Sequence, residues 1–189
     1  EARMAKKSGL GQQLFQGIYD LSGDVSAIGS WSTPVGMLDI TGINKSANER
    51  TQGIVSGNLS YNVFFNDAAG AAHLASRVPP TSTVLTWAMG ATVGDVAGMV
   101  AGLATSYDGS RSADGMLTFD IEMLNNSTPA VWGVMLTPGL KTDTSAANGA
   151  TLDQGAQTTA GAEAILHVTS FTGSNFTATV QDSSDGSSW

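Results

Sequence analysis

The chain has 189 residues, a length that suits one or at most two domains, and it contains no cysteine. The absence of cysteine excludes disulfide scaffolds, iron–sulfur centres, thiol nucleophiles and the usual structural zinc sites. Eight basic residues stand against sixteen acidic ones, giving a formal net charge of −8. This balance argues against a protein that grips nucleic acid through its phosphates. The whole acidic excess lies in residues 51–189, because residues 1–50 carry five groups of each sign.

Residues 30–57 form a polar stretch without sustained periodicity, interrupted by one proline and four glycines. We expect a long loop that acts as a contact arm, because long irregular loops inside compact chains are uncommon and are usually functional. Residues 58–63 then alternate strictly, as in a strand with one buried face. The alternation directs Leu59, Tyr61 and Val63 to the core and leaves Asn58, Ser60 and Asn62 on the polar face.

One helix is predicted, over residues 68–77. The segment is rich in alanine, Asn66 or Asp67 provides an N-cap, and Pro79 and Pro80 end it. A helix of about ten residues is marginal on its own, so we expect it to pack on a sheet.

Further strands are predicted at residues 84–89, 99–107, 117–123 and 130–136. The run 117–123 has the clearest alternation, with apolar Leu117, Phe119, Ile121 and Met123 on one face and Thr118, Asp120 and Glu122 on the other. We expect this strand and the strand at 58–63 to lie in one sheet that has one polar side.

The composition changes after residue 142 to mostly small polar residues, which predicts a linker. We divide the chain into a domain at 1–145, a linker at 146–163 and a C-terminal β module at 164–189. Strand-like runs at 164–171 and 175–181 are followed by a turn at 182–189. A lone hairpin is marginal in water, so we expect this module to be the first part of a truncated β-sandwich-like unit.

No catalytic, metal or cofactor site is predicted. His73 and His167 lie far apart in sequence and are expected to be structural, and the serine in residues 53–57 is misplaced for a nucleophile elbow. The pair Asp182 and Asp185 lacks the spacing of an EF-hand. No phosphate-binding glycine motif occurs, and the longest weakly polar run, 97–104, is too short to span a membrane. We therefore expect a protein that is not an enzyme and has no membrane segment.

Several segments together resemble the major tail proteins, or tail tube proteins, of siphovirus-type bacteriophages, especially those that infect actinobacteria. The matching segments are residues 8–11, 19–24, 38–47, 49–50, 64–66, 71–73, 111, 114–115, 117–119, 132–133, 142–143, 170–173 and 181–185. The resemblance implies a mainly β protein, a β-sandwich or partial barrel with one flanking helix. Such protomers close into homohexameric rings that stack into a tube through which DNA is ejected. The lack of an internal repeat favours one tube domain per chain and six chains per ring.

The resemblance also implies partners and a location. The partners would be further copies of the chain, the tape measure protein and the tail-end proteins, with no cofactor. The protein would be made in the host cytoplasm and reside in the virion tail. The long loop would reach a neighbouring ring, and its candidate contact residues are Leu38, Asp39, Ile40, Thr41, Asn44, Lys45, Glu49 and Arg50.

We expect the polar strand faces to line the lumen, where carboxylates repel DNA phosphates within a Debye length of about 8 Å. The candidate lumen residues are Thr118, Asp120, Glu122, Asn58, Ser60 and Asn62. The competing interpretation is that this face meets solvent or packs on a neighbour. An alternative function is a carbohydrate-binding β-sandwich module on a virion or cell surface, with Phe171 and Trp189 stacking on sugar.

Overall fold

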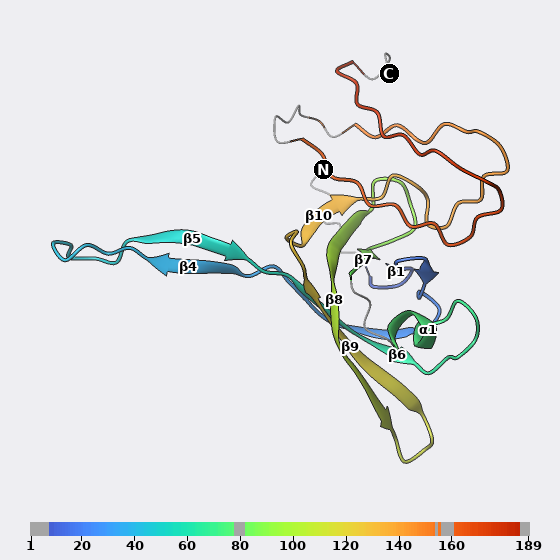
Figure 1. Cartoon of the computed structure of the whole chain (residues 1–189), viewed down its shortest axis with the longest axis horizontal. Helices are drawn as coiled ribbons and strands as arrows, with labels where there is room; N and C mark the ends of the chain where they lie inside the picture. The colour runs from blue at the N-terminus through green and yellow to red at the C-terminus, as the bar shows by residue number, and fades with distance from the viewer. Residues whose placement is uncertain (1–7, 78–81, 154, 156–160, 186–189) are drawn as a thin grey trace.

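The computed structural model describes residues 8–77, 82–153, 155 and 161–185. Its main feature is an antiparallel sheet of eight strands in the order β2-β1-β7-β8-β9-β6-β3, with β10 also paired to β8 (Figure 1). These strands are β1 (Gln13–Gln16), β2 (Tyr19–Asp20), β3 (Val25–Ser32), β6 (Asn58–Phe64), β7 (Thr83–Ala88), β8 (Val96–Arg111), β9 (Leu117–Asn125) and β10 (Val131–Val134). The described strands do not close into a barrel, and the predicted mainly β class is confirmed.

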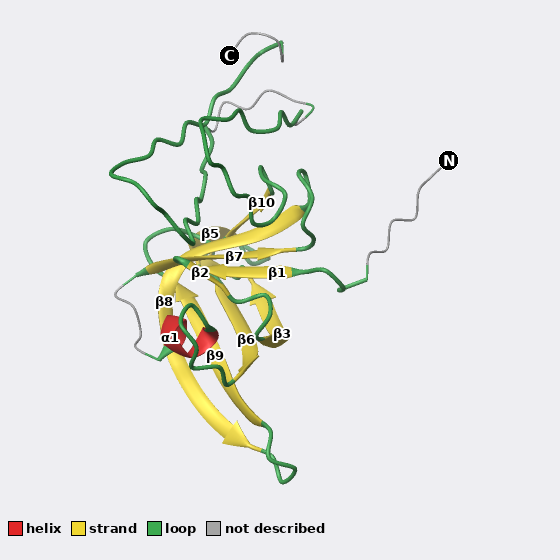
Figure 2. Ribbon diagram, turned by 90° about the vertical axis from the view of Figure 1, so that its right-hand side faces the viewer, coloured by secondary structure: helices red, strands yellow, loops and turns green. Residues whose placement is uncertain are grey.

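The long strand β8 joins two halves of the sheet. Its first half pairs with β7 and β10, and its second half pairs with β9. Figure 2 shows β8 curving from one group of strands to the other. Buried side chains from both halves form one core, which includes Leu14, Leu21, Leu59, Tyr61, Val63, Ala72, Ala75, Leu85, Val100, Ile121, Met123 and Ala130.

The alternation predicted at 58–63 is confirmed, and the one at 117–123 is confirmed in part, because Leu117 at the start of β9 is 38% exposed. Leu59, Tyr61 and Val63 are at most 2% exposed, and Ile121 and Met123 are equally buried. The two strands are direct neighbours in the sheet, as expected. The strands predicted at 84–89, 99–107 and 130–136 also form, as β7, β8 and β10 with different ends.

The helix is shorter than predicted. The helix α1 spans Ala72–Ser76 only, because Gly70 adopts a φ of +83°, in the left-handed region that breaks a right-handed helix. The predicted caps are also wrong. The side chain of Asn66 accepts a bond from the Ala68 N–H in the preceding turn, and the first helical N–H, that of Ala72, donates to Asp24 Oδ2 at 3.0 Å. Pro79 and Pro80 lie outside the described residues.

The loop expected at 30–57 is wrong, because most of it is β-structure. Beyond the end of β3 the chain forms β4 (Val35–Asp39) and β5 (Arg50–Val55), a separate two-stranded antiparallel sheet. We call residues 35–55 the arm. It projects from the body and continues the β3–β6 ribbon (Figure 1).

The C-terminal segment has no regular structure where it is described. Residues 161–185 contain no helix or strand, so the strands predicted at 164–171 and 175–181 are wrong for the described structure. Instead, a side chain attaches the segment to the body. The His167 Nδ1 donates to the Gly17 carbonyl at 2.8 Å, and its Nε2 lies 2.8 Å from Thr86 Oγ1. The domain division stays a prediction, and Trp189 lies outside the described residues.

No helix in the described part of the chain is long and apolar enough to cross a membrane.

Candidate functional site: a polar sheet face and a projecting arm

All six residues predicted for a polar face lie on one face of the β6–β9 pair. The register places Ser60 opposite Glu122 and Asn62 opposite Asp120. Asn58 and Thr118 follow at alternate positions of the same strands, so their side chains share this face. The opposite face of both strands is the buried core. The sheet therefore has one mostly buried side and one side of small polar and acidic groups, which also carries two exposed apolar side chains, Leu124 opposite Asn58 and Phe64 opposite Thr118.

Serines of β3 extend this polar face. Ser30 Oγ lies 2.9 Å from Ser60 Oγ, and Ser32 Oγ donates to Asn58 Oδ1 at 2.5 Å. Ser26 Oγ donates to Asn62 Oδ1. Sequence reasoning missed these serines because β3 shifts register between residues 25 and 27 and again between 28 and 30. Each shift breaks the two-residue period that marks a strand.

The face is acidic and lacks cationic side chains. Asp108 of β8 lies directly opposite Asp120 and adds a third carboxylate to the face. Sequence analysis did not include it, because the predicted strand ended at residue 107. Asn62 Nδ2 donates to Asp120 Oδ1 at 2.7 Å. The strands β3, β6 and β9 contain no lysine or arginine. The single arginine of β8, Arg111, pairs with Leu117, whose side chain alternates to the other face.

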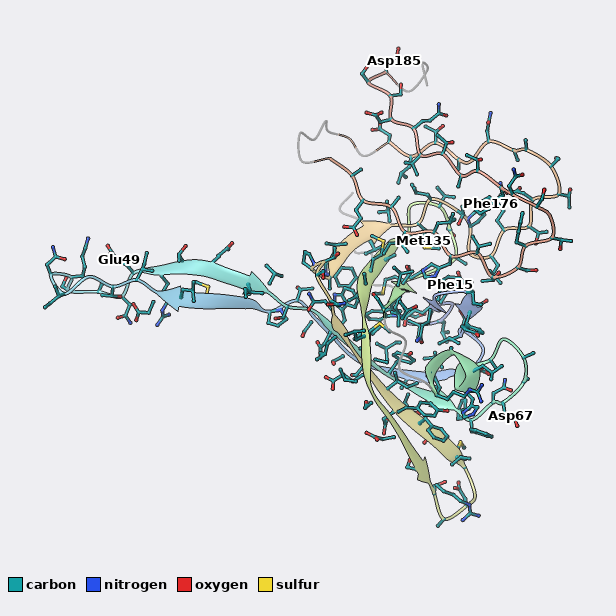
Figure 3. The ribbon with its side chains drawn as sticks, in the orientation of Figure 1. Phe15, Glu49, Asp67, Met135, Phe176 and Asp185 are labelled. Carbon is teal, nitrogen blue, oxygen red and sulfur yellow. The ribbon has the colours of Figure 1, made fainter. Side chains whose placement is uncertain are left out.

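The eight predicted contact residues all lie on the arm or its tip. Leu38 and Asp39 pair with Thr51 and Arg50 across the two strands. Leu38 is 56% exposed, Ile40 is 58% exposed, and the tip residue Ile43 is fully exposed. In Figure 3, Glu49 marks the arm, well separated from Phe15 and Met135 of the body. The arm thus presents apolar side chains that its own chain leaves uncovered, a pattern typical of interaction surfaces.

Local hydrogen bonds hold the end of the arm in shape. Asp39 Oδ1 accepts from the Thr41 N–H at 2.9 Å, and Thr41 Oγ1 accepts from the Glu49 N–H at 2.8 Å. The bonds from Thr41 lower the pKa of Asp39. Lys45 Nζ and Glu49 Oε1 form an ion pair at 2.8 Å. The tip is therefore ordered by its own contacts, although its apolar side chains are exposed.

Each of the two histidines is held by hydrogen bonds and ring contacts, and their structural role stays a prediction. His73 Nδ1 lies 2.7 Å from Tyr107 Oη, and its ring packs edge-on against Phe65. The ring of His167 packs at a tilt against Phe15, with ring centroids 5.7 Å apart. Burial lowers the pKa of His167, and its bond to the Gly17 carbonyl opposes this shift in part. Among the described residues, no three potential metal ligands come together.

No protein-family model matches the chain, and no curated protein matches it. Among the solved structures that match the chain are two from gene transfer agent particles. A chain from the virion of a native gene transfer agent particle has a TM-score of 0.51 and 16% identity, covering 69% of this chain and 99% of that one. A chain from the tail of an empty gene transfer agent particle, refined with C6 symmetry, has a TM-score of 0.47 and 17% identity, and the match again covers 69% of this chain and 99% of that one. The first likeness shows a shared fold, and the second is too low to carry an argument.

Proposed function

We propose that this chain is a structural tail protein of a phage-like particle and that it assembles into hexameric rings stacked as a tail tube. The observation that carries the proposal is the shared fold with a gene transfer agent virion chain, of which 99% is covered. The polar face and the arm support it, because a tube protomer needs an inner surface and a contact between rings. In this role the protein acts by geometry and charge and performs no catalysis.

The polar face is the proposed lumen wall. Its carboxylates, Asp108, Asp120 and Glu122, lie on neighbouring strands with no lysine or arginine among them. Repeated around a ring and along a stack, they would repel DNA phosphates close to the wall and let the genome slide. The serines and asparagines bond to one another across the strands, which leaves them less available to hold a passing phosphate.

The arm is the proposed contact between rings. A two-stranded hairpin is marginal in water by itself, and this one exposes Leu38, Ile40 and Ile43. A neighbouring copy that covers these side chains would stabilise both the arm and the stack. The charged groups beside them, Lys45, Glu49 and Arg50, would set the register of the contact.

The proposed setting is the virion of a siphovirus-type phage with an actinobacterial host, in contact with the tape measure and tail-end proteins. These finer assignments rest on the sequence resemblance described above. The carbohydrate-binding alternative also stays a prediction, and a glycan array tests it directly.

Electron microscopy of the purified chain over a range of concentrations tests the proposed function. We expect rings or tubes with an axial hole, with the β6–β9 polar face toward the hole. Assemblies with that face on the outer wall would refute the lumen assignment. Monomers at every concentration, together with binding on the glycan array, would refute the tube assignment.

A further inference from the structure

The base of the arm is held by a cluster of three tryptophans around a glycine. Trp31, near the end of β3, lies against Trp132 and Trp87, with ring centroids 5.3 and 6.4 Å away. Gly98 of β8 pairs with both Trp87 on β7 and Trp132 on β10. A Cβ at Gly98 would lie 3.0 to 3.1 Å from three atoms of the Trp31 ring. The Trp31 ring therefore occupies the space that a side chain at position 98 would fill.

A second attachment holds the strand that returns from the arm. The Gly57 N–H donates to Asn125 Oδ1 at 2.9 Å, and the Gly57 carbonyl accepts from the Asn125 N–H at 2.9 Å. A Cβ at Gly57 would collide with Ala130. Between the two attachments, the Ser56 N–H donates to the Pro34 carbonyl at 2.8 Å. Both strands of the arm thus leave the body from fixed points.

We propose that Trp31 is a positioning residue: seated over Gly98 between Trp87 and Trp132, it fixes the direction in which the arm projects and hence where the arm meets the next ring. The inference rests on the proposed contact between rings. From β3, Trp31 reaches across to β7, β8 and β10 of the other half of the sheet. It therefore ties the start of the arm to a part of the body that the β3–β6 ladder does not include.

A small tilt at this base has a large effect at the tip. The nine residues from Val35 to Ile43 span about 30 Å at roughly 3.3 Å per residue. A tilt of about 10° would therefore move the tip by about 5 Å, close to the spacing of neighbouring strands. A displacement of that size would shift the arm by a whole strand on its docking surface.

The direction of the arm can be measured by spin labelling, because the chain contains no cysteine. Labels at Ala47→Cys on the tip and Asp67→Cys on the body give one distance distribution in the unassembled protein. We expect a narrow distribution for the parent chain. Gly98→Ala, which displaces the Trp31 ring, should shift or broaden the distribution by about 5 Å, as the tilt estimate predicts. The double variant Gly98→Ala/Trp31→Phe, with a smaller ring, should recover the narrow distribution.

Matched variants separate direction from stability. Gly23→Ala adds a methyl group where nothing lies within 4 Å, and it should leave both the distances and assembly unchanged. If Gly98→Ala does not fold, Trp31→Ala tests the same contact by emptying it. Thermal unfolding of each variant confirms that the body is intact. A merely structural role for Trp31 would lower stability without moving the labels, and that result would overturn the inference.

Assembly measured by sedimentation completes the test. Replacing residues 36–54 with Asn-Gly removes the arm, and a two-residue turn can join Val35 to Val55 because these residues are paired. We expect no assembly of this variant, at least a tenfold higher assembly concentration for Gly98→Ala, and recovery in the double variant. Normal assembly without the arm would refute the ring contact and the inference with it. Failure without the arm but normal assembly of Gly98→Ala would refute the inference alone.

Discussion

Charge reversal on the polar face tests whether its acidity keeps DNA from binding. The variant Asp120→Lys/Glu122→Lys places two cations on adjacent outward positions of β9. Each replacement makes the formal charge two units more positive, so the two together bring the net charge from −8 to −4. Both positions are accessible in the unassembled chain, and the Asn62 amide that bonds Asp120 can turn to water instead. The fold should therefore tolerate the change.

The expected effect follows from counterion release. Each phosphate neutralised by a cation contributes roughly −0.9 to the slope of log K against log salt concentration. Two new contacts give a slope of about −1.8, so a fourfold rise in salt should weaken binding by roughly tenfold. Fluorescence anisotropy with a labelled DNA duplex between 50 and 200 mM salt measures this slope. The parent chain should show no binding over the same range.

A matched variant distinguishes the face from the net charge. Asp67→Lys/Glu163→Lys makes the same change in charge at two exposed positions outside the polar face. We expect little DNA binding from this control, because its cations lie on separate segments. Equal binding by both variants would refute the argument that the arrangement of charges on β9 matters. Binding of DNA by the parent chain would refute the proposed repulsion itself.

Three further predictions concern stability and assembly. Tyr61→Phe removes the 2.5 Å hydrogen bond to Gln16 Oε1 and leaves a buried acceptor. It should lower the free energy of unfolding by about 1–3 kcal/mol in a urea titration, and a change near zero would contradict the buried network. The lowered pKa of His167 means that the folded protein favours the neutral ring. Attachment of the chain at His167 should therefore be complete above about pH 6.5 and weaken as the pH falls below it. Hydrogen exchange, corrected for intrinsic rates, should show this loss in the parent chain and not in His167→Gln. Leu38→Ser/Ile40→Ser should block sedimentation of assemblies without lowering the melting temperature, because both side chains are exposed in the single chain. Normal assembly of this variant would contradict a ring contact through the arm.

Sequence periodicity predicted the strands that have one buried and one wet face. The alternations of β6 and β9 were visible because every second side chain enters the core along β6 and, in β9, at Ile121 and Met123. The arm was mistaken for a loop because β4 is exposed at every residue and β5 at all but one, so its strands show no contrast between two faces. The helix was overextended because alanine content indicates propensity, whereas Gly70 sets the actual boundary.

The polar face was predicted in part, since strand alternation places six of its residues without any knowledge of the fold. Asp108 and the serines of β3 could not be assigned to it, because their membership depends on which strands pair and in what register. The strand-like runs near the C-terminus show the opposite error, in which the sequence predicts strands that the described structure does not contain. Their composition favours strands, but the described residues there have no strand partner. What the face and arm contact in an assembly depends on other chains.

The continuity of the arm with β3 and β6 determines how the protein would carry mechanical load. A pull along the arm draws both of its strands in the same direction, so it does not separate β3 from β6. The load passes instead to the β6–β9 ladder, where seven residue pairs, from Asn58 with Leu124 to Phe64 with Thr118, resist it together in shear. Bonds loaded in parallel must break together, whereas bonds that are peeled apart break one at a time. In the proposed tube, arms loaded in this way would stay attached to their subunits when the tube bends.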